Sequence, residues 1–322
     1  MHSGETQSDS AKETKQRIEY FDLAKGICIL LVVMHHIGIE TPIDNYLNII
    51  RMPLYFYLSG YFFKRYDGFI SFLIKKTNKL LVPFFFFYLT TAVLIPIIAH
   101  HIAGISFALP LDWKLMYAFL TYNDYPNLPL WFLWGLFVLN IVFYGLHKAV
   151  SNIWILGAVC LILFAALGHT IDFPASLSKV FDGMIFFYLG YVFRLKNLSQ
   201  LYSHKMIILI MACLFIGLGF IETSNDACIL ILRIAMAVTG VLSLIYLCQH
   251  IKHIPYISYV GRYSIMLLVT HEPLIKLMSL MYIANPYIRF AIISASYLAL
   301  IPLMRKFMPH VTAQKDLITL TK

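Results

Sequence analysis

Long apolar runs are the feature that most constrains what this chain can fold into. The hydrocarbon core of a bilayer is about 30 Å thick, so a helix needs roughly 20 apolar residues to cross it. The chain is 60% hydrophobic and 13% charged, whereas soluble domains are about 45–50% apolar and about 25% charged. We expect an all-α polytopic membrane protein with about ten transmembrane helices. The runs lie near 21–39, 46–63, 80–102, 130–147, 152–168, 178–193, 205–221, 228–248, 260–281 and 286–304.

The basic residues predict how the chain is oriented. If the N-terminus is cytoplasmic, 18 of the 25 Lys and Arg fall in inner segments and only Lys114, Lys179 and Arg289 in outer ones. Inner loops carry the excess of basic residues in membrane proteins, so both termini should be cytoplasmic. The net charge of +9 is then a topology signal, and no nucleic-acid partner is needed to explain it.

Three segments are expected. Residues 1–17 are polar and lack the apolar core of a signal peptide, which predicts a disordered cytoplasmic tail that stays attached. Residues 18–305 would form the transmembrane domain, and residues 306–322 a second cytoplasmic tail. The five cysteines have no metal-ligand spacing, so no metal is expected.

Ionisable residues inside membrane spans are costly and usually functional. Six of them should share one layer in the outer half of the membrane. Some ionisable residues could instead have a purely structural role. Arg51 and Arg233 are long enough to reach the outer headgroups, and so is Lys276 near the outer end of its span. His35 fits a packing role. The six are His36, Arg51, Asp182, Arg233, His271 and Glu272.

One face of the first span carries charge at both ends. Lys25 and His36 are 11 residues apart, about 1,100° around a helix and within about 20° of whole turns. Asp22 joins the same stripe. A long ligand could lie along it with an anionic end at Lys25 and a reactive end at His36. Lys76 and Lys79 could clamp phosphates as paired cations, or could belong to a basic segment on the membrane surface.

Several stretches together resemble the membrane-bound acyltransferase family 3. The first, RIEYFDLAKGICILLVVMHH, supplies Asp22, Lys25, Gly26 and His36. The others are MPLYFYLSGYFFKR, KKTNKLLVPFFF, PLWFLWGLF, FFYLGYVFR and YVGRYSIMLLVTHEPL, which supplies His271. Among the branches of the family, the stretch PLWFLWGLF is most similar to the fucose 4-O-acetylase-like sugar O-acetyltransferases. Lys stands at positions 25, 76 and 79 where the family commonly has Arg, which keeps the charge and loses bidentate geometry.

The resemblance implies transfer of an acyl group, commonly acetyl from cytoplasmic acetyl-CoA, in a bacterial inner membrane. The acceptor would be a hydroxyl of a cell-envelope glycan or its lipid-linked precursor. His36 would be the general base, oriented by His271 or Glu272, with Arg51 stabilising the oxyanion and Arg233 as second candidate. Lys25, Lys76 and Lys79 would hold the CoA phosphates. Direct transfer and a covalent acyl-histidine remain open.

Two other functions compete with acyl transfer. A transporter or flippase for a glycan or acyl compound could use the intramembrane charges as its pathway. The absence of a recognisable internal repeat weighs against this class. A degenerate relative with a binding or regulatory role is the third possibility, and the joint presence of Lys25, His36, Arg51 and His271 weighs against it.

Overall fold

The regular structure of the described chain is helical. The computed structural model describes residues 18–39, 44–105, 115, 126–170, 175–198 and 204–319. The expected tail of residues 1–17 lies outside them. The elements are α1 (Glu19–Ile37), α2 (Asp44–Tyr61), α3 (Phe69–Lys76), η1 (Thr77–Leu81), α4 (Val82–Ala103), η2 (Leu128–Leu130), α6 (Trp131–Ala149), α7 (Ile153–Ala165), η3 (Ala166–Thr170), α8 (Ala175–Asp182), α9 (Met184–Leu195), α10 (Lys205–Leu218), α11 (Asp226–Ile251), α12 (Pro255–Arg262), α13 (Ser264–Leu280) and α14 (Pro286–Phe307).

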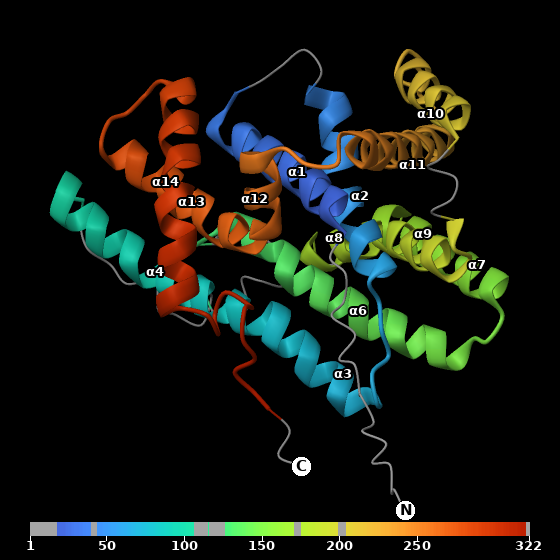
Figure 1. Ribbon diagram of the computed structural model, residues 1–322, viewed down its shortest axis with the longest axis horizontal. Helices are drawn as coiled ribbons and strands as arrows, with labels where there is room; N and C mark the ends of the chain where they lie inside the picture. The colour runs from blue at the N-terminus through green and yellow to red at the C-terminus, as the bar shows by residue number, and fades with distance from the viewer. Residues whose placement is uncertain are drawn as a thin grey trace, which may run out of the picture.

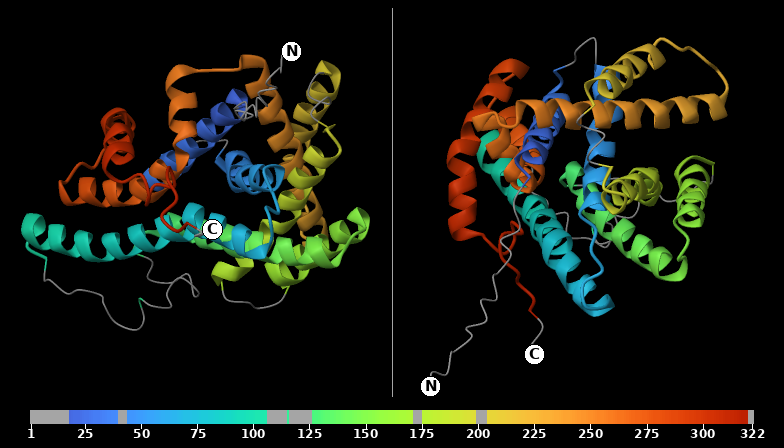
Figure 2. Two further views of the ribbon diagram at one scale, coloured as in Figure 1. Left: turned by 60° about the horizontal axis from the view of Figure 1, so that its bottom comes forward. Right: turned by 45° about the vertical axis from the view of Figure 1, so that its right-hand side comes forward.

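Helix α1 lies at the centre of the bundle. It contacts α2, α11, α12, α13 and α14, so it is enclosed along most of its length (Figure 1). Around it, α2 packs along α9, α10 along α11, and α13 against α4 (Figure 2). The central position explains why Phe21, Ile29 and Val33 of α1 are almost completely buried.

Five helical segments of the described chain are long and apolar enough to cross a membrane. They are Glu19–Ile37, Phe69–Ala103, Leu128–Ala149, Asp226–Ile251 and Pro286–Phe307, and two shorter apolar helices cover Ile153–His169 and Lys205–Leu218. Other expected spans are broken, since 178–193 is divided between α8 and α9 and 260–281 between α12 and α13. The helical membrane fold is therefore supported, while the count of ten spans and the cytoplasmic termini stay predictions.

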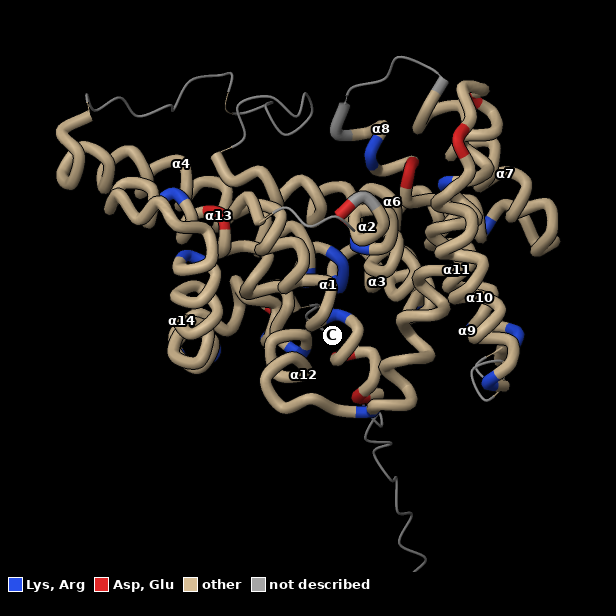
Figure 3. Tube along the Cα trace, turned by 90° about the horizontal axis from the view of Figure 1, so that it is seen from above, with Lys and Arg blue, Asp and Glu red and all other residues tan. Residues whose placement is uncertain are grey.

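The outward surface is apolar where a bilayer would contact it. Trp154 of α7, Leu209 of α10 and Leu298 of α14 expose more than half of their surface. Figure 3 shows how few positions along the helices are charged. Contiguous apolar exposure on this scale would make a water-soluble protein aggregate, so lipid is the fitting solvent for these faces.

The C-terminal segment, residues 308–319, returns to the start of the long helix formed by α3, η1 and α4 (Figure 1). The buried Asn78 side chain holds it: Nδ2 donates to the Ile318 carbonyl over 2.7 Å, and Oδ1 accepts from the N–H groups of Leu317 and Ile318. Lys75 pairs with Asp316, and Lys79 Nζ donates to the Ala313 carbonyl over 2.5 Å. Part of the segment expected as a cytoplasmic tail is thus docked on the helices.

Candidate active site

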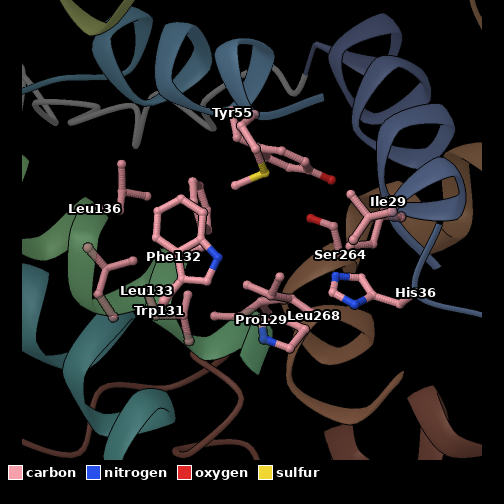
Figure 4. Close-up of a pocket in the computed structure, with 14 residues that line it drawn as sticks. Ile29, His36, Tyr55, Pro129, Trp131, Phe132, Leu133, Leu136, Ser264 and Leu268 are labelled. Atoms are coloured by element: carbon pink, nitrogen blue, oxygen red, sulfur yellow. The ribbon is translucent and has the colours of Figure 1, made fainter. Parts of the chain in front are cut away.

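A largely apolar cavity of about 180 Å³ opens between α1, α2, α6 and α13. His36 lines it together with the hydroxyl-bearing Tyr55 and Ser264. Figure 4 shows these three side chains on one side of the cavity, across from Phe132, Leu133 and Leu136. Most of the lining is aliphatic or aromatic, so the few polar groups are the ones that can orient a ligand and react with it.

The end of α1 sets the position of His36. The helix ends at Ile37, and Gly38 follows with a φ of 86°, a left-handed conformation that glycine adopts without strain. Ile29 and Val32 line the same cavity as His36 because positions seven and four residues earlier share its helix face. Lys25 continues this stripe toward the other end of the helix. Its Nζ lies 2.7 Å from Asp22 Oδ1, and it does not line the cavity.

Two residues of α13 lie against His36. The Glu272 Oε2 atom is 3.8 Å from His36 Nδ1, an ion-pair distance that is too long for a hydrogen bond. The buried ring of His271 lies 5.2 Å from the His36 ring, centroid to centroid. His271 Nδ1 is 2.8 Å from the Leu267 carbonyl, which can only accept, so Nδ1 carries the hydrogen. His36, His271 and Glu272, selected from the sequence, therefore form one cluster.

A proline next to this cluster explains how α13 is held. Pro273 has no N–H to donate to the Val269 carbonyl four residues earlier. The buried Asn127 side chain takes its place, with Nδ2 donating to that carbonyl over 2.8 Å. Lys276, expected to reach the headgroups, instead donates to the Pro126 carbonyl over 2.7 Å and lies 3.7 Å from Glu272 Oε1. These contacts fix α13 beside the segment that leads into α6.

Arg51 is buried and paired. Its Nη2 lies 2.5 Å from Asp44 Oδ1, and only 4% of its side chain is exposed. The headgroup-reaching alternative for Arg51 therefore does not fit its position. His35 Nδ1 lies 3.3 Å from the other Asp44 oxygen, with about half of the His35 side chain exposed. Arg51 does not line the cavity of His36, although it is near enough for its charge to act on the His36 imidazole.

The basic pair Lys76 and Lys79 lies just before the cavity along the chain. Leu80, the residue after Lys79, lines the cavity. Lys76 Nζ lies 5.6 Å from the centroid of the Phe72 ring. Lys79 Nζ lies 3.8 Å from Asp316 Oδ1. A hydrogen bond from Lys75 to the same carboxyl holds the pKa of Asp316 below its usual range. Asp316 is therefore ionised at neutral pH and lies where an anionic ligand of Lys75 and Lys79 would lie.

Asp182 and Arg233 lie at a second cavity, beside His169 of η3. Asp182 Oδ1 is 2.9 Å from His169 Nε2, and Asp182 Oδ2 is 3.9 Å from Arg233 Nη2. Neither Asp182 nor Arg233 lines the cavity of His36, so the six residues expected in one layer do not form a single site. Asn127, Tyr55 and Ser264 were not among the residues singled out from the sequence. Pro273 was a signal for a partner such as Asn127, because a proline inside a helix frees a carbonyl.

Within the described ranges, no group of three or more His, Cys, Asp or Glu is arranged to hold a metal ion.

Comparison with known proteins gives one positive result. The family model described as "Acyltransferase domain", of the acyltransferase 3 family, matches residues 18–305. This range includes α1 to α13 and most of α14, and therefore both cavities. No curated protein and no solved structure matches the chain significantly.

Proposed function

Because the chain belongs to the acyltransferase 3 family, we propose that this membrane acyltransferase moves an acetyl group from cytoplasmic acetyl-CoA to a hydroxyl of a saccharide. The acceptor would be a cell-envelope glycan or its lipid-linked precursor, as for the fucose 4-O-acetylase-like branch of the family. The enzyme would lie in a bacterial inner membrane. One observation carries the proposal. His36 lines an apolar cavity, and Glu272 and His271 lie next to the His36 ring.

The arrangement suits general-base catalysis. With Glu272 beside Nδ1, Nε2 is the His36 nitrogen left for the acceptor. The hydroxyl oxygen bonds to the thioester carbonyl carbon while its proton passes to Nε2. When the carbonyl reforms, the carbon–sulfur bond breaks and the same proton passes to the departing CoA sulfur. The Glu272 carboxylate stabilises the transient imidazolium, and it would move closer than 3.8 Å as the charge develops.

Charge that develops on the carbonyl oxygen needs a donor. The hydroxyl of Ser264 lines the cavity and is our side-chain candidate for this donor. Arg51 keeps its proposed role at longer range, because its guanidinium is paired with Asp44 and lies outside the cavity lining. Arg233 is assigned no part in this step, since it lies at the other cavity.

Lys25, Lys76 and Lys79 are proposed to bind the CoA phosphates at the cytoplasmic side. Lys76 and Lys79 come just before Leu80, which lines the cavity. Lys25 shares the helix face of Ile29 and Val32, which also line it. In this proposal the pantetheine arm follows the apolar lining toward His36. Lysines supply charge without the two-pronged geometry of arginine, so we expect phosphate binding that depends strongly on ionic strength.

The test of this function is catalytic cleavage of acetyl-CoA. Purified protein in liposomes that contain bacterial envelope lipids and glycans should release CoA thiol from acetyl-CoA in many turnovers, without an ion gradient. Saturation with acetyl-CoA is expected. If labelled glycan instead crossed the liposome membrane while acetyl-CoA stayed intact, the chain would be a transporter and the proposal would be wrong.

Removing the Asp316 carboxylate should improve donor binding. Asp316 is ionised beside Lys75 and Lys79, so a phosphate must displace it. A pair of partly exposed charges contributes ~0.2–1 kcal/mol. We therefore expect Asp316→Asn to lower the KM for acetyl-CoA up to about fivefold, with kcat unchanged.

The matched control for this change is Asp226→Asn at the exposed start of α11, which removes one charge far from the lysines. Steady-state CoA release over a range of acetyl-CoA concentrations measures both variants. A higher KM in Asp316→Asn would show that the C-terminal segment helps to bind the donor rather than competing with it.

A further inference from the structure

A second cavity of about 200 Å³ lies beside the cavity of His36 and plays no part in the chemistry proposed above. Helices α2, α6, α7, α8, α9 and α11 all contribute to its wall. It differs from the first cavity in being lined by charged side chains. The lining residues that matter here are Asn48, Met52, Trp131, Lys179, Asp182 and Arg233.

Two side chains separate the cavities. Met52 of α2 and Trp131 of α6 line both of them, so each contributes to the partition. Methionine is unbranched and has three rotatable bonds, which makes it able to move aside without disturbing the backbone. A group held in the second cavity therefore lies one side chain away from the space that His36 faces.

The charged groups of the second cavity converge on Asp182. His169 Nε2 lies 2.9 Å and Arg233 Nη2 3.9 Å from its two oxygens. Lys179 is near enough to act on the carboxylate, and its Nζ lies 5.4 Å from the centroid of the Trp131 ring. Groups of this kind are costly among membrane helices and usually serve a ligand or a pathway.

The chemistry of this lining matches a saccharide. A sugar ring has an apolar face, which an aromatic side chain can cover. Its hydroxyls can donate hydrogen bonds to a carboxylate and accept them from amide and cationic groups. Among the described lining residues the cations Lys179 and Arg233 outnumber the single carboxylate of Asp182. A surplus of positive charge favours a ligand with one negative group.

We propose that the second cavity is the acceptor subsite and that it selects a saccharide bearing an anionic group, a carboxylate or a phosphate. This rests on the proposed acyl transfer. Lys179 and Arg233 bind the anionic group, Asp182 accepts hydrogen bonds from ring hydroxyls, and the reacting hydroxyl passes between Met52 and Trp131 to His36. The two sources of the negative group, a uronic acid or a phosphate-linked lipid carrier, share this recognition.

The experiment replaces the Lys179 charge reversibly. In Lys179→Cys, a methanethiosulfonate reagent forms a mixed disulfide with the cysteine sulfur and releases methanesulfinate. The aminoethyl reagent restores a cation at position 179, and the sulfonatoethyl reagent places an anion there. Transfer of labelled acetyl from acetyl-CoA to the host's own glycans is measured in membrane vesicles, together with the KM for acetyl-CoA.

We expect Lys179→Cys to lower transfer about tenfold, the aminoethyl reagent to recover most of it, and the sulfonatoethyl reagent to lower it further. The KM for acetyl-CoA should stay unchanged. The matched control is Lys148→Cys, at the exposed end of α6 away from both cavities, and wild type treated with each reagent reports on the exposed Cys213 and Cys228.

The labelled product identifies the anionic group. It should bind an anion exchanger. Release of the sugar by mild acid would indicate a phosphate link. Loss of the negative charge after carboxyl reduction would indicate a uronic acid. A neutral product, or equal transfer with both reagents, would overturn the subsite. A parallel change in the KM for acetyl-CoA would assign the cavity to the donor. Wild type that cleaves no acetyl-CoA would reject the proposed function itself, and the subsite with it.

Discussion

Replacing His36 by Gln should lower the kcat for acetyl transfer by about 10²–10⁴-fold, the range that a positioned general base contributes. Glutamine keeps most of the volume and a polar end but cannot take a proton from the acceptor hydroxyl. The KM for acetyl-CoA should change little, because Lys25, Lys76 and Lys79 are the proposed phosphate ligands. Initial rates of label transfer measure this in membranes with matched amounts of protein.

The neighbouring residue provides the control. His35→Gln makes the same chemical change one position earlier on α1, where the side chain is about half exposed and does not line the cavity. It should retain most of the wild-type rate. Equal losses in both variants would mean that the substitutions disturb the end of α1, and equal rates would remove His36 from the chemistry.

Adding one methyl group between α2 and α9 should prevent the chain from folding stably. A Cβ atom built at Gly60 would lie 1.8 Å from the Phe187 carbonyl oxygen, and one at Gly190 would lie 1.9 Å from that of Tyr57. Neither backbone can move without separating the two helices. Overpacking in a core costs about 1–3 kcal/mol and sometimes more. We expect Gly60→Ala to lose most of its monodisperse yield after detergent extraction and to lower the Tm of what remains.

Gly145→Ala tests whether this loss comes from packing. Gly145 lies inside α6, and a Cβ atom there would meet nothing within 4 Å. Alanine favours a helix over glycine by ~1 kcal/mol, so this variant should match or exceed the wild-type Tm. Equal yields and Tm values for Gly60→Ala and Gly145→Ala would show that α2 and α9 are not in backbone contact.

The sequence predicted the helical membrane fold because apolar run length is a local property. It also placed His36, His271 and Glu272 among six residues expected in one layer, and these three lie together in the structure. It could not predict the breaks between α8 and α9 or between α12 and α13. Those depend on which neighbouring helix each half packs against, which is information that run length does not carry.

Side-chain pairings, near and far along the chain, were also beyond the sequence. Arg51 and Asp44 lie seven residues apart, but Asp44 precedes the apolar run and gave no sign that it would pair with a buried arginine. The docking of residues 308–319 on Asn78 depends on contacts about 240 residues apart in the chain. Asp182 and Arg233 were expected in the same layer as His36, yet they line a different cavity, because position along a span does not specify which way a helix face points.

The most direct test of the account is a single turnover of purified wild type with acetyl-CoA labelled in the acetyl group, in liposomes that contain the saccharide acceptors. The account predicts that each CoA thiol released is matched by one labelled acetyl bound to a saccharide, as an ester that hydroxylamine cleaves. It also predicts that His36→Gln forms neither product on the same timescale. CoA release at the same rate from the variant, or wild type that leaves acetyl-CoA intact, would contradict it.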